Sequence, residues 1–178
     1  MVNDIKKVSL TEEKIGELVK NLGEQITKDY QDKEPVFVGL LKGCNPFMMD
    51  LLKQVKTYCS VEYMDVSSYK GTSSTGKLVI NQDLKTDIAG KDVIIVDDIL
   101  DTGRTLLEVK KLLTSRGAKS IKLCVLLNKP EGRLVPIEAD YVGDLVPNEF
   151  VVGYGLDYNE RYRNLPFIGV LKEEIYSK

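Results

Sequence analysis

Apolar runs alternate along the chain with stretches in which apolar residues recur at helical spacing. The runs predict strands at 35–41, 93–96 and 120–128, and less regular segments predict further strands at 60–66, 78–81, 141–146 and 150–154. The stretches with helical spacing lie at 15–26 and 106–113. This alternation predicts an α/β fold, with one domain across residues 1–178 and a largely parallel, twisted sheet flanked by helices on both faces.

Short polar signals mark where the first two helices are expected to begin. Ser9 and Glu12 have the spacing of a capping box, which predicts a helix that begins after Ser9. Asn45 and Pro46 fit an N-cap and the first helical position, and they predict a helix that extends to about Val55. This second helix directly follows a predicted strand, so the first half of the chain already contains a strand–loop–helix unit.

The composition narrows the compartment and the classes of partner. The 178 residues carry a formal net charge of −2 and a pI near 5.4, whereas general nucleic-acid binders normally present a basic face. No segment has the apolar core of a signal peptide or the length of a membrane span. We therefore expect a cytoplasmic protein that binds neither nucleic acid nor membranes.

The chain contains no histidine, which excludes Ser-His-Asp and Cys-His catalysis and every His-ligated metal site. Proton transfer then falls to Asp, Glu, Lys, Tyr or Cys, and any metal is expected to be a hard cation on oxygen ligands, Mg²⁺ above all. The three cysteines are far apart and lack zinc-ligand spacing. Cys44 lies in a loop after a predicted strand, where a reactive thiol and a passive small residue are both open.

Carboxylates gather where an apolar strand ends and the next helix begins. Asp97 and Asp98 close the strand, and Asp101 opens the loop that leads to the helix. Backbone N–H groups at the helix start, with the hydroxyls of Thr102 and Thr105, would hold a phosphate. Carboxylates beside such a cradle suit the hydroxyls of a ribose or a divalent cation. The pattern therefore favours a ribose 5-phosphate as the ligand.

The same residues allow a second interpretation. Asp101 would be the N-cap of the helix, and Asp97 and Asp98 would be solvated acids at a strand end, as receiver-like domains also have. Neither a Walker-type loop nor a Gly-x-Gly-x-x-Gly motif is present to decide the question.

Five segments resemble one enzyme family. Residues 93–105 closely resemble the phosphoribosyl-pyrophosphate signature of the type I phosphoribosyltransferases. Further segments resemble the hypoxanthine-guanine branch of that family, in register across 35–171: Leu41, Lys42 and Gly43; Ser68 and Tyr69; Lys129; and 150–160 with Arg163. The resemblance implies the type I phosphoribosyltransferase fold, with a small base-binding hood formed by the chain ends. It also implies a homodimer or homotetramer.

The activity that this resemblance implies is purine salvage. The 5-phosphoribosyl group would pass, with Mg²⁺ as cofactor, from phosphoribosyl pyrophosphate to N9 of the purine base hypoxanthine or guanine. IMP or GMP and pyrophosphate would be the products. Asp101 would be the catalytic carboxylate that faces N7 of the purine.

The resemblance assigns the other matching residues to parts of the substrates. The ribose 5-phosphate would contact Asp97, Asp98, Asp101, Thr102, Gly103, Arg104 and Thr105. Pyrophosphate would contact Lys42, Gly43 and Arg163, with a cis peptide bond before Lys42. The purine would contact Lys129, Phe150, Val151 and Asp157. Mg²⁺ would be held by Asp97, Asp98 and Asp157. Ser68 and Tyr69 would begin a lid in the polar segment 67–77, whose plainer interpretation is a surface connection.

Two related functions stay open. A phosphoribosyl-pyrophosphate-sensing regulatory protein of the same fold would need a basic surface for nucleic acid, and the acidic pI argues against one. A xanthine-preferring relative would differ in the backbone near Val151 and Asp157, which the sequence does not determine. Lys129 argues against adenine, because a donor there would face another donor on that base.

Overall fold

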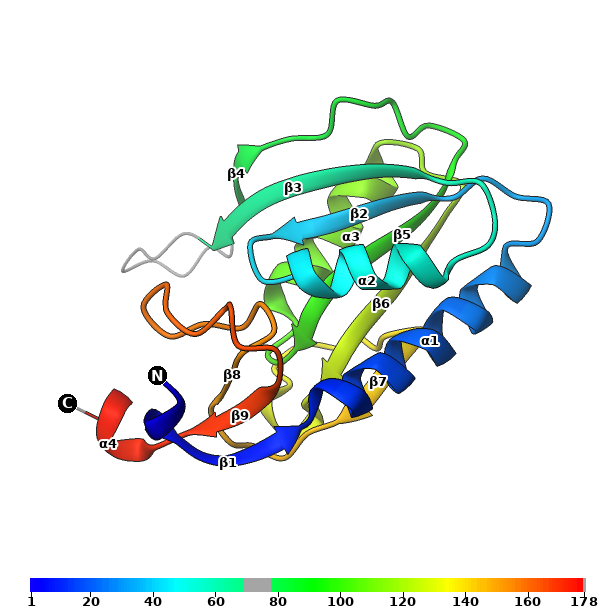
Figure 1. Cartoon of the computed structure of the whole chain (residues 1–178). Helices are drawn as coiled ribbons and strands as arrows, with labels where there is room; N and C mark the ends of the chain where they lie inside the picture. The colour runs from blue at the N-terminus through cyan, green and yellow to red at the C-terminus, as the bar shows by residue number, and fades with distance from the viewer. Residues whose placement is uncertain (69–77, 178) are drawn as a thin grey trace.

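The computed structural model describes residues 1–68 and 78–177 and contains two sheets, with helices packed around the larger one (Figure 1). The helices are α1 Glu12–Asp29, α2 Asn45–Gln54, α3 Arg104–Ser115 and α4 Glu173–Tyr176, with 3-10 turns at Val2–Asp4 and Pro130–Gly132. The strands are β1 Ile5–Leu10, β2 Val36–Leu41, β3 Ser60–Ser68, β4 Leu78–Gln82, β5 Asp92–Leu100, β6 Ser120–Asn128, β7 Tyr141–Leu145, β8 Val151–Val152 and β9 Ile168–Leu171. Among the described residues, no helix has the length and apolar character needed to cross a bilayer.

The larger sheet has six strands in the order β4-β3-β2-β5-β6-β7. Neighbouring strands are parallel, except that β4 runs antiparallel to β3. The predicted largely parallel sheet is therefore confirmed. Because parallel strands end on the same side of a sheet, the carboxyl ends of β2, β5 and β6 lie next to one another, at the edge where ligands bind in α/β folds.

Side chains of β5 alternate between the two faces of this sheet. Ile94 and Val96 pack in a buried cluster with residues of α1 and α2, whereas Val93 and Ile95 pack in a second cluster with α3. Figure 1 shows the same division, with α1 and α2 in front of the sheet and α3 behind it. The run 93–96 is continuously apolar because both of its faces are covered. Helices on both faces were predicted, and this is confirmed.

The two ends of the chain form a small antiparallel sheet in the order β1-β9-β8. The central strand, β9, pairs on one side through Ile168 with Leu10 and on the other through Val170 with Val151. Figure 1 shows both termini beside this sheet, on the side toward which β5 and β6 end. The hood expected from the chain ends is therefore present as a structural unit.

The first helix begins later than predicted, because residues 5–10 pair as a strand. Ser9 lies in β1, and Thr11 is the N-cap of α1, with its side-chain oxygen accepting a hydrogen bond from Lys14 N at 3.2 Å. The capping box predicted from Ser9 and Glu12 is wrong. Pairing of β1 with β9, at the other end of the chain, overrides this local signal.

Two further boundaries differ from the prediction by a few residues. Asn45 is the first residue of α2, and Cys44 takes the N-cap position that was predicted for Asn45. The strand predicted to end at Val96 continues to Leu100, because its residues keep pairing with β6. The two acids that follow Val96 therefore lie on a strand, which limits their freedom more than a loop would.

Candidate active site

Two adjacent carboxylates, those of Asp97 and Asp98, project from β5 near its carboxyl end. Asp98 N donates to Asp97 Oδ1 at 3.0 Å, and Ile99 N donates to Asp98 Oδ1 at 2.8 Å. Burial raises the pKa of Asp97 well above its usual range, and the neighbouring charge of Asp98 raises it further. Burial also raises the pKa of Asp98, although hydrogen bonds from Asp97 and Ile99 and the charge of Arg163 oppose this rise. The pair is thus an electrostatically costly feature that a cation would relieve.

The turn between β5 and α3 depends on Gly103. Its φ of 79° lies in the left-handed region, and a Cβ added there would lie 2.5 Å from Ile137 Cγ2. Gly103 is the N-cap of α3, so the interpretation of Asp101 as the N-cap is wrong. Thr102 and Gly103 instead bring the amino end of the helix beside Asp101, where the helix dipole favours an anion.

Asp101 and Lys129 come together from the ends of neighbouring strands. Lys129 Nζ lies 3.4 Å from Asp101 Oδ2, and the lysine side chain is only 12% exposed against 42% for the aspartate. Lys129 N also donates to the carbonyl of Leu100 at 2.9 Å. Gly132 packs against the same carboxylate, since a Cβ added there would lie 1.9 Å from Asp101 Oδ1. A carboxylate and an ammonium group therefore face one small volume.

The loop after β2 touches the acid pair at a glycine. A Cβ added to Gly43 would lie 1.9 Å from Asp98 Oδ2, so only glycine permits this approach. A Cβ added to Gly155 would in turn lie 2.0 Å from the carbonyl oxygen of Gly43, which ties a C-terminal segment to the same loop. The peptide bond Leu41-Lys42 is cis, as the resemblance implied.

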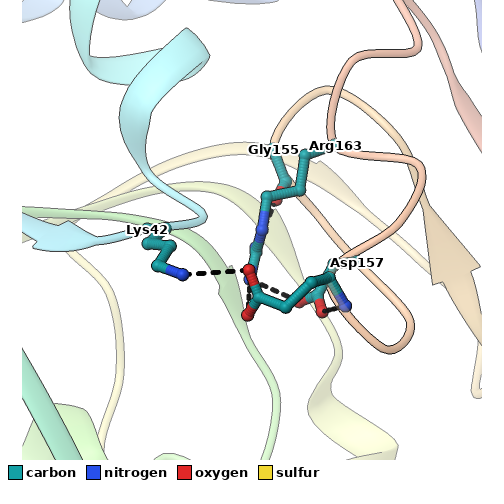
Figure 2. A network of polar contacts seen from close by, with 5 residues as sticks. Lys42, Gly155, Asp157 and Arg163 are labelled. Carbon is teal, nitrogen blue, oxygen red and sulfur yellow. Dashed lines mark hydrogen bonds and ion pairs between the residues drawn. The ribbon is translucent and has the colours of Figure 1, made fainter.

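Charged side chains of this loop and of the C-terminal segment form one network (Figure 2). Lys42 Nζ lies 3.0 Å from Glu160 Oε2, and Arg163 Nη2 lies 3.2 Å from Glu160 Oε1 and 2.9 Å from Asp157 Oδ1. Arg163 Nη1 also donates to the carbonyl of Gly155 at 2.7 Å. Hydrogen bonds to Lys42 and Arg163 hold the pKa of Glu160 below its usual range. Lys42 and Arg163, the two cations expected to contact pyrophosphate, thus both pair with the carboxylate of Glu160.

Phe150 lies just before β8, with its side chain 37% exposed. Its ring stacks on Tyr176 at a centroid distance of 4.9 Å and makes a T-shaped contact with Tyr158 at a centroid distance of 5.7 Å. Val151 is buried in β8, where it pairs with Val170. The aromatic group is therefore braced from two sides, which suits a ring that presents a surface to a planar ligand.

Two other predicted residues have different outcomes. Ser68 ends β3, and Tyr69, the other residue of the predicted lid, lies outside the described residues. Cys44 is fully buried, and burial followed by the charges of Asp97 and Asp98 raises the pKa of its thiol. Of the two alternatives for Cys44, this burial supports the passive small residue, because a raised pKa disfavours the reactive thiolate.

Two residues of the site were not predicted from the sequence. Glu160 was matched within a longer segment but was given no role, although it pairs with both Lys42 and Arg163. Arg133 was not singled out, yet its guanidinium group donates to the carbonyl of Asp101 at 2.9 Å. The mixture of acidic and basic residues in 157–163 was a weak hint for the first, and nothing local marks the second.

A family model described as a phosphoribosyl transferase domain matches residues 4–159, most of the chain. The chain belongs to the phosphoribosyltransferase family. This phosphoribosyltransferase is 54% identical over 176 residues to a hypoxanthine-guanine phosphoribosyltransferase from Streptococcus pyogenes, with 98% of each chain covered. The crystal structure of a hypoxanthine phosphoribosyltransferase from Staphylococcus aureus superposes with a TM-score of 0.97 at 55% identity, covering 100% of this chain and 97% of that one.

A longer relative is also similar to this phosphoribosyltransferase. This relative, a bifunctional protein TilS/HprT from Listeria monocytogenes, is 56% identical to the present chain over 179 residues. The match covers 100% of this chain but only 28% of that protein's length. The similarity therefore concerns one part of the longer protein.

Proposed function

We propose that this phosphoribosyltransferase acts in purine salvage. It transfers the 5-phosphoribosyl group of phosphoribosyl pyrophosphate to N9 of hypoxanthine or guanine, and releases IMP or GMP and pyrophosphate. The single observation that carries this proposal is the pairing of Asp101 with Lys129 beside the amino end of α3. Asp101 as a proton acceptor and Lys129 as a hydrogen-bond donor could then face a purine, with the phosphate cradle next to them. The names of the similar proteins from Streptococcus pyogenes and Staphylococcus aureus agree with it.

The sugar phosphate is proposed to bind across the β5–α3 turn. The backbone N–H groups of Thr102, Gly103, Arg104 and Thr105 would surround the 5-phosphate at the helix terminus. Asp97 and Asp98 would accept hydrogen bonds from the ribose hydroxyls, since ionised carboxylates are acceptors only. These contacts would hold C1′ toward the purine that Asp101 and Lys129 face.

Mg²⁺ is the proposed cofactor, and the residues present fit it. Asp97 and Asp98 are adjacent acids whose ionisation is opposed by burial, so a nearby cation stabilises their charged forms. Within residues 1–68 and 78–177, no group of three or more His, Cys, Asp and Glu is gathered for a metal. Mg²⁺ usually keeps several waters and takes phosphate oxygens of its substrate beside the carboxylates of the protein. Asp157, paired here with Arg163, would contribute as well. Bound Mg²⁺ would neutralise charge on the ribose and pyrophosphate oxygens.

The purine is proposed to lie between Phe150 and the strand ends. The Phe150 ring would stack on it, and backbone groups of Val151 and Asp157 would contact its edge. Lys129 would donate to the oxygen at C6, which selects 6-oxopurines over adenine. As N9 bonds to C1′ and the bond from C1′ to the pyrophosphate oxygen breaks, Asp101 would accept the proton from N7. The electron pair of the broken bond leaves with pyrophosphate.

The leaving group is proposed to meet Lys42, Gly43 and Arg163. This region adjoins the acid pair, because the Gly43 backbone packs against Asp98 and the charge of Arg163 acts on Asp98. Cationic groups placed where charge develops are the usual way of stabilising an anionic leaving group.

The direct test is turnover by the purified protein with phosphoribosyl pyrophosphate, Mg²⁺ and each of hypoxanthine, guanine, xanthine and adenine. We expect IMP and GMP with equimolar pyrophosphate, and little product from adenine. A preference for xanthine would redirect the proposal to the related enzyme. Absence of turnover on every base, together with tight phosphoribosyl pyrophosphate binding, would point to the sensing function instead.

Assembly and location remain predictions. We propose that residues 1–178 act as one catalytic domain in the cytoplasm, and that the protein is a homodimer or homotetramer. Light scattering of the purified protein measures its mass directly, and a monomer at micromolar concentration would contradict the assembly.

A further inference from the structure

Arg133 has an unusual set of hydrogen-bond partners. Its partly buried guanidinium group donates to the carbonyls of Asp101 at 2.9 Å, Ile137 at 2.5 Å and Leu100 at 3.3 Å. It also donates to Asn128 Oδ1 at 2.5 Å. No ion pair joins it to an acidic side chain in the described part of the chain, so these hydrogen bonds go to four neutral oxygens.

Three of the four acceptors lie at the two strand ends that carry the proposed purine contacts, and the fourth, the Ile137 carbonyl, lies in the connection that leads to β7. Leu100 ends β5 and directly precedes Asp101, and Asn128 ends β6 and directly precedes Lys129. Asn128 is only 8% exposed, and it is the single polar residue counted as buried among those that the structure describes. A buried amide of this kind is usually retained for the hydrogen bond that it makes.

The stem of Arg133 also contacts the phosphate cradle. Its Cδ atom would lie 3.1 Å from a Cβ added to Gly103, so the methylene groups pack directly against this turn. The side chain therefore joins three parts of the site: the turn at Gly103, the end of β5 and the end of β6.

We propose that Arg133 is a positioning residue that fixes the separation of Asp101 and Lys129, so that both reach the purine at once. The inference rests on the proposed function, because N7 and the oxygen at C6 lie at a fixed distance on one edge of the base. Charge-assisted hydrogen bonds to both strand ends hold that distance. An arginine is suited to this task because its planar fork is rigid and stays charged at all relevant pH values.

The sharpest variant is Arg133→Lys. It keeps the charge and a methylene stem against Gly103 but replaces the fork with a single nitrogen, which cannot span the same four acceptors. A displacement of the order of 1 Å in a reacting group costs up to about 100-fold in rate. We expect kcat/KM for hypoxanthine to fall about tenfold or more, while KM for phosphoribosyl pyrophosphate stays within about threefold of wild type.

Arg116→Lys is the matched control. Arg116 also uses its fork, donating to both carboxylate oxygens of Asp83 at 2.6 Å, but it lies just beyond the carboxyl end of α3. The same chemical change there is expected to leave all kinetic constants unchanged.

Ligand binding separates positioning from a general structural role. Arg133→Lys is expected to weaken IMP binding about tenfold and to leave ribose 5-phosphate binding unchanged, as measured by calorimetry. Equal weakening of both ligands, or unchanged kinetics, would overturn the proposal. Should Arg133→Lys fail to fold, Asn128→Ala is the second test, because it removes a single acceptor. It is expected to weaken IMP binding by a smaller factor and again to leave ribose 5-phosphate binding unchanged. Wild type that makes no IMP would instead refute the proposed function itself.

Discussion

The two ends of the site are held together by different forces. At the base-and-phosphate end, Lys129 is 12% exposed, its ion pair with Asp101 is partly shielded, and the surrounding contacts include backbone hydrogen bonds and close packing against glycines, as where Gly103 meets Ile137. At the pyrophosphate end, Lys42 and Glu160 are 62% and 64% exposed, and an ion pair of 3.0 Å joins them. The first end resembles a protein core and the second a protein surface.

The base-and-phosphate end therefore has a fixed geometry, whereas the ion pairs of the pyrophosphate end can exchange partners. Close packing transmits small displacements, so the base-and-phosphate end is preorganised before any ligand arrives. Ion pairs between exposed side chains contribute little to stability and exchange with other anions. A transferase needs both kinds of region, because it must aim the reacting atoms and still release a highly charged product.

The largest expected effect is at the fixed end, in Asp101→Asn. The amide keeps the shape of the carboxylate but cannot accept the proton of N7, so kcat should fall by about 10²–10⁴-fold. Ribose 5-phosphate binding should be retained, because the phosphate is held by the turn and the helix terminus. Steady-state kinetics and calorimetry measure the two quantities. Asp32→Asn, at an exposed turn that precedes the amino end of β2, is the control, and equal turnover in both variants would remove Asp101 from its role.

Gly103→Ala should have the next largest effect. The added Cβ would meet Ile137 Cγ2 at 2.5 Å and would force the turn to move, so kcat/KM for phosphoribosyl pyrophosphate should fall about 100-fold. Gly90→Ala is the matched control, since its φ of 72° is similar but nothing lies within 4 Å of the added Cβ. Both variants are expected to lose stability, and only Gly103→Ala to lose substrate affinity. The same kinetic loss in both would show that close packing at Gly103 is unimportant.

The same contrast decides how much the sequence could predict. Buried strands were foreseen because cover on both faces leaves a continuous apolar run, as at 93–96. The strand β1 was not, since residues 5–10 are extended only through their pairing with β9 at the far end of the chain. A local capping pattern at Ser9 was stronger than any strand signal in that segment.

Within the site, local motifs were visible and long-range partners were not. Asp97, Asp98 and Asp101 lie close together in the sequence, at the end of a predicted strand and in the following loop, so the sequence alone indicated them as site residues. Arg133 reaches Leu100 across 33 residues, and Glu160 reaches Lys42 across 118. Sequence spacing cannot predict a guanidinium group whose acceptors come from separate segments, so the roles of such residues become visible only in the folded chain.

Asp97→Asn should change stability by a smaller amount, with a defined dependence on pH. Aspartate in an unfolded chain titrates near pH 4. Because burial raises the pKa of Asp97 in the folded chain, the wild type loses stability as pH rises from about 4 through the folded-state pKa. Without ligands and with a chelator present, Asp97→Asn should be more stable than wild type by about 1–2 kcal/mol at neutral pH. Urea unfolding at several pH values checks this.

The difference in stability between the two proteins should shrink as the pH falls toward 4 and become independent of pH below it, where Asp97 is protonated in both the folded and unfolded wild type. A variant less stable than wild type at neutral pH would show that Asp97 contributes more through its hydrogen bond to Asp98 N than it costs through burial. The fixed end would then be stabilised by its acids rather than strained by them.

The smallest effect is expected at the exchangeable end, from Glu160→Gln. This carboxylate pairs with Lys42 and Arg163, the two cations proposed for pyrophosphate, so an incoming anion must displace it. Removing its charge also removes its repulsion of the ligand. Pyrophosphate should therefore bind about two- to tenfold more tightly, and the difference should shrink in high salt.

Glu17→Gln is a close match for this change, because Glu17 is 68% exposed and pairs with Lys14 at 3.4 Å on α1. It should leave pyrophosphate affinity unchanged, which separates a local exchange of partners from a general change in net charge. Tighter binding in Glu160→Gln should also slow product release, so kcat falls wherever release limits turnover. Weaker pyrophosphate binding would mean that Glu160 orients the two cations for the ligand instead of competing with it. The pyrophosphate end would then be preorganised like the base-and-phosphate end, and the contrast between them would disappear.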